Sequence, residues 1–205
     1  MTSHTDSNRR TVVGNISLSL DGRVHGLGGD HDMGWIVPHA VTDAARDLMV
    51  RLSSTATTVV LGRKNYEGFG GHWPTVARDP DAEPRDRATG QWLDAVEKVV
   101  VSTTLTGAEW SNSRVVNADP AAVVEELRSQ PGGDIVVLNS SSVIRSLLRA
   151  GQLDRLIVTL CPEIVGGGAR LLEDGLPTSS WRLLDLASSD TGALCLTYER
   201  IPATS

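Results

Sequence analysis

The sequence of 205 residues contains neither a long apolar stretch nor a strongly basic segment. Its apolar runs, such as Ile135–Leu138, have the length of a strand, whereas a membrane-spanning helix needs about 20 apolar residues. The net charge is −6, and no basic cluster is longer than the pair Arg9-Arg10, so a surface for polyanions is not supported. We therefore expect a soluble chain that binds neither membranes nor nucleic acid.

Cysteine is also scarce. The two cysteines, Cys161 and Cys195, lie in apolar runs without paired spacing. This is typical of reduced core cysteines rather than of a disulfide framework or a metal site, and it favours a cytoplasmic location. One loop does gather four potential metal ligands, but without the fixed spacing of a metal site, so we expect no metal. These four residues are Asp30, His31, Asp32 and His39.

A chain of this length is expected to form a single domain, here over residues 11–201. The polar residues 1–10 lack the apolar run of a secretory signal and are expected to be a disordered lead. Beyond them, strand-like and helix-like patterns alternate. Strands are expected at residues 11–20, 57–61, 99–101, 114–116, 135–138, 153–160, 181–186 and 193–200, and helices at 38–53, 120–127 and 140–150.

Two long segments read as loops. Residues 23–38 are rich in glycine, and residues 70–90 carry three prolines and several charges, so we expect a mobile loop at 70–90. The last two strands read as a hairpin. The pattern predicts an α/β fold with a mostly parallel central sheet, a C-terminal antiparallel hairpin and helices on both faces. Ligands are then expected at the carboxyl ends of the strands.

A phosphate site is indicated after the strand at 57–61. Gly62, Arg63, Lys64 and Asn65 stand where that strand turns into a helix, and free backbone N–H groups at a helix start favour an anion. Two adjacent cations also suit the 2′-phosphate that distinguishes NADPH from NADH. The alternative is an ordinary solvated helix start.

A second strand-to-helix turn carries Asn139, Ser140, Ser141 and Ser142. Asparagine tolerates a left-handed backbone, and serine hydroxyls can bind phosphate or cap a helix. This segment therefore either contributes to a phosphate site or forms a simple helix N-cap.

Proton donation to a substrate would need a positioned acid. Asp43 and Asp47, four residues apart in the first long helix, are the candidates. The alternative is that both are solvated helix carboxylates.

Four segments in this order resemble the dihydrofolate-reductase-like superfamily, which has a three-layer fold. They are Ser19-Leu20-Asp21-Gly22, Leu61-Gly62-Arg63 with Tyr66-Glu67, Val100-Val101-Ser102-Thr103 and Val165-Gly166-Gly167-Gly168. Within it, the chain is most similar to stand-alone relatives of the C-terminal reductase domain of the bifunctional riboflavin-biosynthesis deaminase-reductase. This resemblance extends from about residue 11 to residue 200.

The resemblance implies NADPH as the cofactor. It assigns the cofactor phosphates to Gly62 and Arg63 with Lys64 and Asn65, although the family usually has threonine at Asn65. It places Asn139 to Ser142 at the family's glycine-rich turn beside the pyrophosphate, but here the glycines are missing. The remaining implied cofactor contacts, near the adenosine phosphate, are Ser102 and Thr103, for which an ordinary strand-ending turn is the alternative.

The same resemblance implies a substrate pocket. It has Asp21 structuring the turn over the nicotinamide, Trp35 lining the pocket, and Gly166 and Gly167 near the pocket and a dimer interface. Leu138 stands where the riboflavin-pathway reductases have glutamate, and the zinc-deaminase domain is absent from this sequence. We therefore do not expect the pathway enzyme itself.

These features together predict a homodimeric NADPH-dependent reductase. It would transfer hydride to a C=N or C=C bond of a small pterin-like, pyrimidine-like or other heterocyclic molecule. Two alternatives stay open, namely a non-catalytic ligand-binding protein and a flavin-binding member of the same fold.

Overall fold

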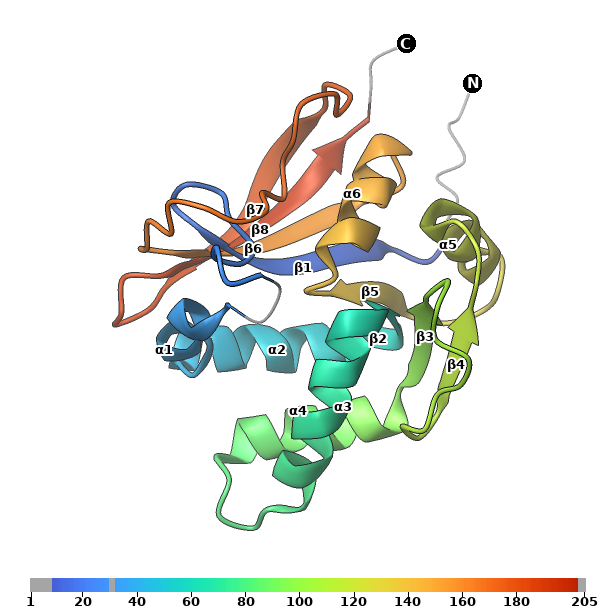
Figure 1. Ribbon diagram of the computed structural model, residues 1–205, viewed down its shortest axis with the longest axis horizontal. Coiled ribbons are helices and arrows are strands. Elements are labelled where there is room, and N and C mark those ends of the chain that lie inside the picture. Colours follow the sequence, from blue (N-terminus) through green and yellow to red (C-terminus); the bar gives the residue numbers. More distant parts are fainter. Residues whose placement is uncertain (1–8, 30–31, 203–205) are drawn as a thin grey trace.

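The structure, a computed structural model, describes residues 9–29 and 32–202 (Figure 1). The strands are β1 Val12–Ser19, β2 Ala56–Gly62, β3 Glu97–Val101, β4 Ser113–Val116, β5 Asp134–Leu138, β6 Arg155–Cys161, β7 Ser180–Ser188 and β8 Leu194–Ile201. The helices are the 3-10 turn η1 Gly34–Ile36, then α1 Val37–Ala40, α2 Asp43–Thr55, α3 Arg63–Arg78, α4 Pro84–Ala95, α5 Pro120–Arg128 and α6 Ser141–Arg149. No helix in these ranges is both long and apolar enough to cross a membrane.

The strands form one sheet in the order β4-β3-β2-β5-β1-β6-β8-β7. The six strands from β4 to β6 are parallel, and β8 and β7 close the sheet as an antiparallel hairpin. The predicted sheet and hairpin are thus confirmed. Because the parallel strands share one direction, their carboxyl ends meet at one edge.

The sheet has a hydrophobic core on each face. Successive residues of a strand point to opposite faces, so Val12 lies in one core and Val13 in the other. The first core holds apolar side chains of α5 and α6, and the second holds those of α2, α3 and α4. Figure 1 shows the two groups of helices on opposite sides of the sheet. The prediction of helices on both faces is confirmed.

The helix predicted at residues 38–53 is divided in two. Its first part is the single turn α1, and α2 starts only at Asp43. The break lies at Thr42, whose hydroxyl donates to His39 O at 2.9 Å and accepts from Ala45 N at 3.4 Å. A threonine N-cap begins a new helix at this point.

The prediction of a mobile loop at residues 70–90 is wrong, because α3 and α4 fill most of this range. Pro84 occupies the first turn of α4, where no backbone N–H is needed, and Glu83 caps that helix. Gly90 serves helix packing, since a Cβ there would lie 2.9 Å from Ala77 N and from Trp73 O of α3. These residues read as loop formers but belong to a close helix pair.

The predicted disordered lead at residues 1–10 falls mostly outside the described residues, since residues 1–8 are not among them. Arg10, however, contradicts the prediction, because it is only 6% exposed. Its guanidinium donates to Gly133 O at 2.7 Å, Leu127 O at 3.2 Å and Thr58 Oγ1 at 2.7 Å. Each guanidinium nitrogen thereby has at least one acceptor, which makes a buried arginine tolerable.

We expect Arg10→Ala to lower the free energy of unfolding by about 2 to 4 kcal/mol, because it leaves buried acceptors unpaired. Arg9→Ala is the matched control. The Arg9 side chain is 51% exposed and lies 4.0 Å from Glu125, so its removal should cost less than about 1 kcal/mol. Urea denaturation of both variants tests this, and equal losses would contradict the structural role of Arg10.

Candidate cofactor and substrate site

The carboxyl ends of β2 and β5 are joined by hydrogen bonds. Gly62 N donates to Ser140 Oγ at 2.9 Å, and that hydroxyl donates to Leu138 O at 2.9 Å. Asn65 Nδ2 donates to Asn139 O at 2.8 Å and to Ser140 Oγ at 3.2 Å. The fold thus brings together two segments selected from the sequence, at Gly62–Asn65 and Asn139–Ser142. It does so through their own side chains.

Asn139 has a left-handed backbone, with φ of 48°. Its side-chain oxygen accepts a hydrogen bond from Ser17 N at 3.3 Å, which ties the turn to β1. An asparagine can adopt this conformation at lower cost than most residues. The turn therefore forms here without the glycines that the family usually has.

The two helices that start at this junction have no side-chain cap. Gly62 precedes α3 and has no side chain to offer, and the hydroxyl of Ser140 before α6 is turned to Gly62 and Leu138 instead. By contrast, α2, α4 and α5 are capped by Thr42, Glu83 and Asp119. Uncapped helix starts present N–H groups and a positive dipole to an anion. The serine run is therefore not the simple side-chain N-cap that was the alternative.

The two cations predicted for phosphate binding lie in the first turn of α3. Arg63 and Lys64 are exposed. The guanidinium of Arg63 lies 3.4 Å from Thr104 Oγ1 in the loop after β3 and 3.9 Å from Glu67 of its own helix. Arg63 thus spans the ends of β2 and β3.

At the end of β3 the two predicted residues differ in what they contact. Ser102 Oγ accepts from Thr104 N at 3.2 Å and from Leu105 N at 3.0 Å, so this hydroxyl shapes a turn. Thr103 is exposed beside it. Thr104, which the sequence reasoning did not select, contacts Arg63, and only the fold shows that contact.

Asp21 holds two loops together at the end of β1. Its carboxylate accepts from Ser19 Oγ at 2.7 Å, from Val165 N and Gly166 N at 3.0 Å each, and from Arg23 Nε at 3.2 Å. The hydrogen bond from Ser19, followed by that from Val165 N, holds the pKa of Asp21 well below its ordinary value. Asp21 thus fixes the glycine run against the strand end.

The glycine run packs on the loop that follows β1. At Gly168 φ is +84°, and a Cβ would lie 2.0 Å from His25 O. At Gly167 a Cβ would meet the Leu27 side chain at 2.5 Å, and Gly166 has open space around it. The close backbone approach at Gly167 and Gly168 is therefore made to the chain's own loop after β1.

Trp35 lies in the 3-10 turn η1, and its indole N–H is buried. In the described part of the chain, this N–H has no acceptor. A buried indole N–H usually donates to an acceptor, so the position of the Trp35 N–H suits a polar ligand atom.

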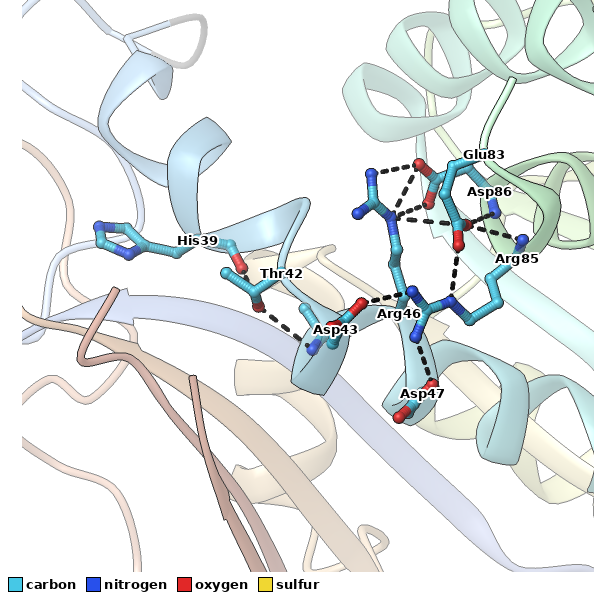
Figure 2. Close-up of polar contacts among 9 residues, drawn as sticks. His39, Thr42, Asp43, Arg46, Asp47, Glu83, Arg85 and Asp86 are labelled. Atoms are coloured by element: carbon cyan, nitrogen blue, oxygen red, sulfur yellow. Dashed lines mark hydrogen bonds and ion pairs between the residues drawn. The ribbon is translucent and has the colours of Figure 1, made fainter. Parts of the chain in front are cut away.

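Asp43 and Asp47 lie on the exposed flank of α2 (Figure 2). Both carboxylates accept hydrogen bonds from Arg85 at the start of α4, Asp47 at 2.7 Å. Hydrogen bonds to Asp47 and then Asp43 raise the pKa of the Arg85 guanidinium above its ordinary value. The side chains of Asp43 and Asp47 are 83% and 53% exposed, so these aspartates join α2 to α4 at the surface.

His39 is a buried residue that the sequence singled out only as a potential metal ligand. Its Nδ1 lies 2.8 Å from Thr191 Oγ1 of the β7–β8 turn, and its Nε2 lies 3.4 Å from Glu163 Oε1. It therefore joins α1 to two loops. Of the other potential ligands, Asp30 and His31 lie outside the described residues. Among the residues that the structure describes, no group of three side chains is arranged to hold a metal ion.

We expect Asp21→Asn to lower the melting temperature at neutral pH, with the difference shrinking as the pH falls below 3.8. The lowered pKa means that ionised Asp21 stabilises the folded state above its unfolded pKa, and protonation removes this contribution. Thermal unfolding from pH 7 to pH 3 measures it, with the exposed Asp190→Asn as the control. A difference that does not depend on pH would contradict the assignment.

The chain is similar to a known protein family and to a bacterial protein. The model of the RibD C-terminal domain matches residues 10–195. The uncharacterized protein YyaP of Bacillus subtilis is 23% identical over 192 residues, a match that covers 93% of this chain and 95% of that protein. Both matches extend over nearly the whole chain.

Three solved structures share the fold. A putative riboflavin biosynthesis protein from Shewanella sp. PV-4 has a TM-score of 0.66 at 18% identity, covering 94% of this chain and 99% of that one. The deaminase/reductase of Thermotoga maritima has a TM-score of 0.63 at 14% identity, covering 96% of this chain but 58% of that one. The dihydrofolate reductase of Enterococcus faecalis, complexed with NADP(H), has a TM-score of 0.58 at 18% identity, covering 93% and 96%.

These structures confirm the dihydrofolate-reductase-like fold that the sequence predicted. The family model covers the strands from β1 to β7 and the strand ends that form the candidate site. The chain belongs to the RibD C-terminal domain family.

Proposed function

We propose that this protein is a cytoplasmic NADPH-dependent reductase of a small heterocyclic molecule that is pterin-like or pyrimidine-like. The observation that carries the proposal is the pair of uncapped helix starts, α3 and α6, joined by Ser140 and flanked by Arg63. Similarity to reductases of the riboflavin and dihydrofolate type supports the same reading.

The residues present fit a dinucleotide phosphate. The N-termini of α3 and α6 would hold the pyrophosphate, with Asn139 and Asn65 setting the shape of the turn. Arg63 and Lys64 would meet the 2′-phosphate with Thr103 nearby, because a guanidinium pairs well with phosphate oxygens. NADPH supplies a hydride when bound.

The chain's own part in the reaction is to orient the substrate and exclude water. The loop after β1, held by Asp21 and Gly168, would cover the nicotinamide, and Trp35 would line the substrate pocket. Asp43 and Asp47 both pair with Arg85 on the exposed flank of α2, and this pairing favours a role in joining α2 to α4 over proton donation.

We expect purified protein to bind NADPH more tightly than NADH in a titration followed by tryptophan fluorescence. Arg63→Ala should weaken NADPH binding about tenfold to a hundredfold, because it removes a charged hydrogen-bond donor to phosphate. Arg78→Ala is the matched control, since it removes an exposed arginine from the opposite end of the same helix.

Failure of the protein to bind either nucleotide would overturn this proposal in favour of a non-catalytic ligand-binding protein. Protein that purifies yellow, with a bound flavin and no affinity for NADPH, would favour the flavin alternative. An Arg63→Ala variant with unchanged affinity would place the phosphate elsewhere.

We also propose a homodimer, as the family resemblance implies. On the face that carries α5 and α6, Leu186 pairs with Leu196, and Leu196 pairs with the core residue Val158. Leu183 pairs with Tyr198. Leu183 and Leu186 are 47% and 54% exposed. On this face, the hairpin extends past α6 in Figure 1. An exposed apolar sheet face of this kind suits a second copy of the chain.

We expect Leu186→Lys to convert the dimer to monomer in analytical ultracentrifugation, because the charge would be buried in an apolar interface. Val50→Lys is the control, because Val50 is 41% exposed on α2, on the other side of the sheet. Parent protein that sediments as a monomer would refute the dimer.

A further inference from the structure

The contact between α2 and α4 changes in character along the two helices. Arg85 near the start of α4 donates to Asp47 of α2 at 2.7 Å, and Trp92 near its end donates to Ala56 O, directly after α2, at 3.4 Å. The two helices therefore run side by side in the same direction. Farther along, both contribute leucine side chains to one hydrophobic core. Toward their starts, by contrast, charged side chains make the contact.

Glu83 lies at the centre of these charges (Figure 2). Its carboxylate caps α4 by accepting from Arg85 N at 2.7 Å and from Asp86 N at 3.1 Å. It also accepts from Arg85 Nε at 2.8 Å and lies 3.6 Å from Arg46 Nε of α2. The residue that caps α4 therefore also joins that helix to α2.

Two arginines carry the remaining contacts between the helices. Arg46 donates to both carboxylate oxygens of Asp86 at 2.8 to 3.0 Å, and bidentate pairs of this kind are strong. Arg85 donates to both aspartates of α2. We call the whole set the charge cluster, and its members are Asp43, Arg46, Asp47, Glu83, Arg85 and Asp86. Four carboxylates thus face two guanidinium groups, so carboxylates would repel one another if either arginine were displaced.

The charge cluster is accessible to salt. The side chains of Arg46, Asp86 and Arg85 are 19%, 26% and 30% exposed. Salt weakens the attraction between such charges, because the Debye length falls from about 30 Å at 0.01 M to about 3 Å at 1 M. The apolar contact farther along the helices does not depend on this attraction. Salt should therefore loosen the first halves of α2 and α4 and leave their ends in place.

The charge cluster also lies between the two parts of the proposed site. Helix α4 packs closely on α3 at Gly90, so these two helices are held as one unit. That unit begins at Arg63, beside the candidate phosphate site. Helix α2 follows η1 and α1, the segment that carries Trp35. A change in the position of α3 can thus reach the Trp35 side of the site through the charge cluster.

We propose that the charge cluster couples the cofactor to the substrate side of the site, and that salt releases this coupling. An anion bound at the start of α3 would fix that helix, and the cluster would extend the ordering to the first turn of α2. This inference rests on the proposed function, because NADPH is the molecule that would fix α3. Glu83, Arg46 and Arg85 act as positioning residues, through the helices that they join.

Hydrogen exchange followed by mass spectrometry tests the coupling on the whole protein. Without nucleotide, exchange at residues 84–91 of α4 should be about tenfold faster at about 1 M NaCl than at about 0.01 M. Exchange in α5, which Asp119 caps, should change much less. At the lower salt concentration, saturating NADPH should slow exchange at residues 43–50 of α2 about fivefold or more. At the higher concentration, saturating NADPH should leave this exchange unchanged.

Four variants separate the charges from the fold. Glu83→Gln keeps an oxygen that can cap α4 but removes the charge, so NADPH should still bind without slowing exchange in α2. Asp81→Asn is the matched control and should behave as the parent, because it removes an exposed carboxylate from the loop between α3 and α4. Arg46→Glu should abolish the effect of NADPH. Adding Asp86→Arg to it should restore that effect, because opposite charges again face each other across the two helices.

The possible failures are distinct. Parent protein that binds NADPH without slower exchange in α2 overturns the coupling. Exchange in α4 that does not respond to salt shows that charges do not hold its first half. A Glu83→Gln variant that behaves as the parent, or a double variant without recovery, overturns the assignment to the charge cluster. Protein that does not bind NADPH overturns the proposed reductase and the link to the cofactor, and the salt series alone then decides whether charges hold α4 on α2.

Discussion

The hydrogen bonds of Ser140 determine the geometry of the whole candidate site. Its hydroxyl accepts from Gly62 N and donates to Leu138 O, so it joins the carboxyl ends of β2 and β5. The same oxygen cannot also cap α6. The cost of that missing cap is offset when an anion takes its place, because the N–H groups of a helix start favour negative charge. The side chain that joins the two strand ends thus also leaves the start of α6 without a side-chain cap.

The rest of the site follows from this junction and from the parallel sheet. Arg63 extends toward the end of β3, and Asn139 links the turn to β1. Asp21 and His39 hold the surrounding loops, so the strand ends are framed by fixed segments. These contacts gather at the carboxyl edge of the parallel strands.

The sequence predicted much of this arrangement from local signals. Alternating strands and helices predicted the parallel sheet and the hairpin, since period and length are local properties. The prediction from the sequence failed where one residue type can serve two structural purposes. Gly90 and Pro84 read as loop formers, yet they pack and start helices. Arg10 read as part of a disordered polar lead, yet its acceptors lie on segments distant in the sequence.

By itself, then, the sequence determined the order of the strands, the cations and serines at the strand ends, and the left-handed tendency of Asn139. Only the tertiary structure decided which side chains act together. Ser140 turns away from its own helix because Gly62 N lies within reach. This is an effect of contacts between distant segments, and local periodicity carries no information about them.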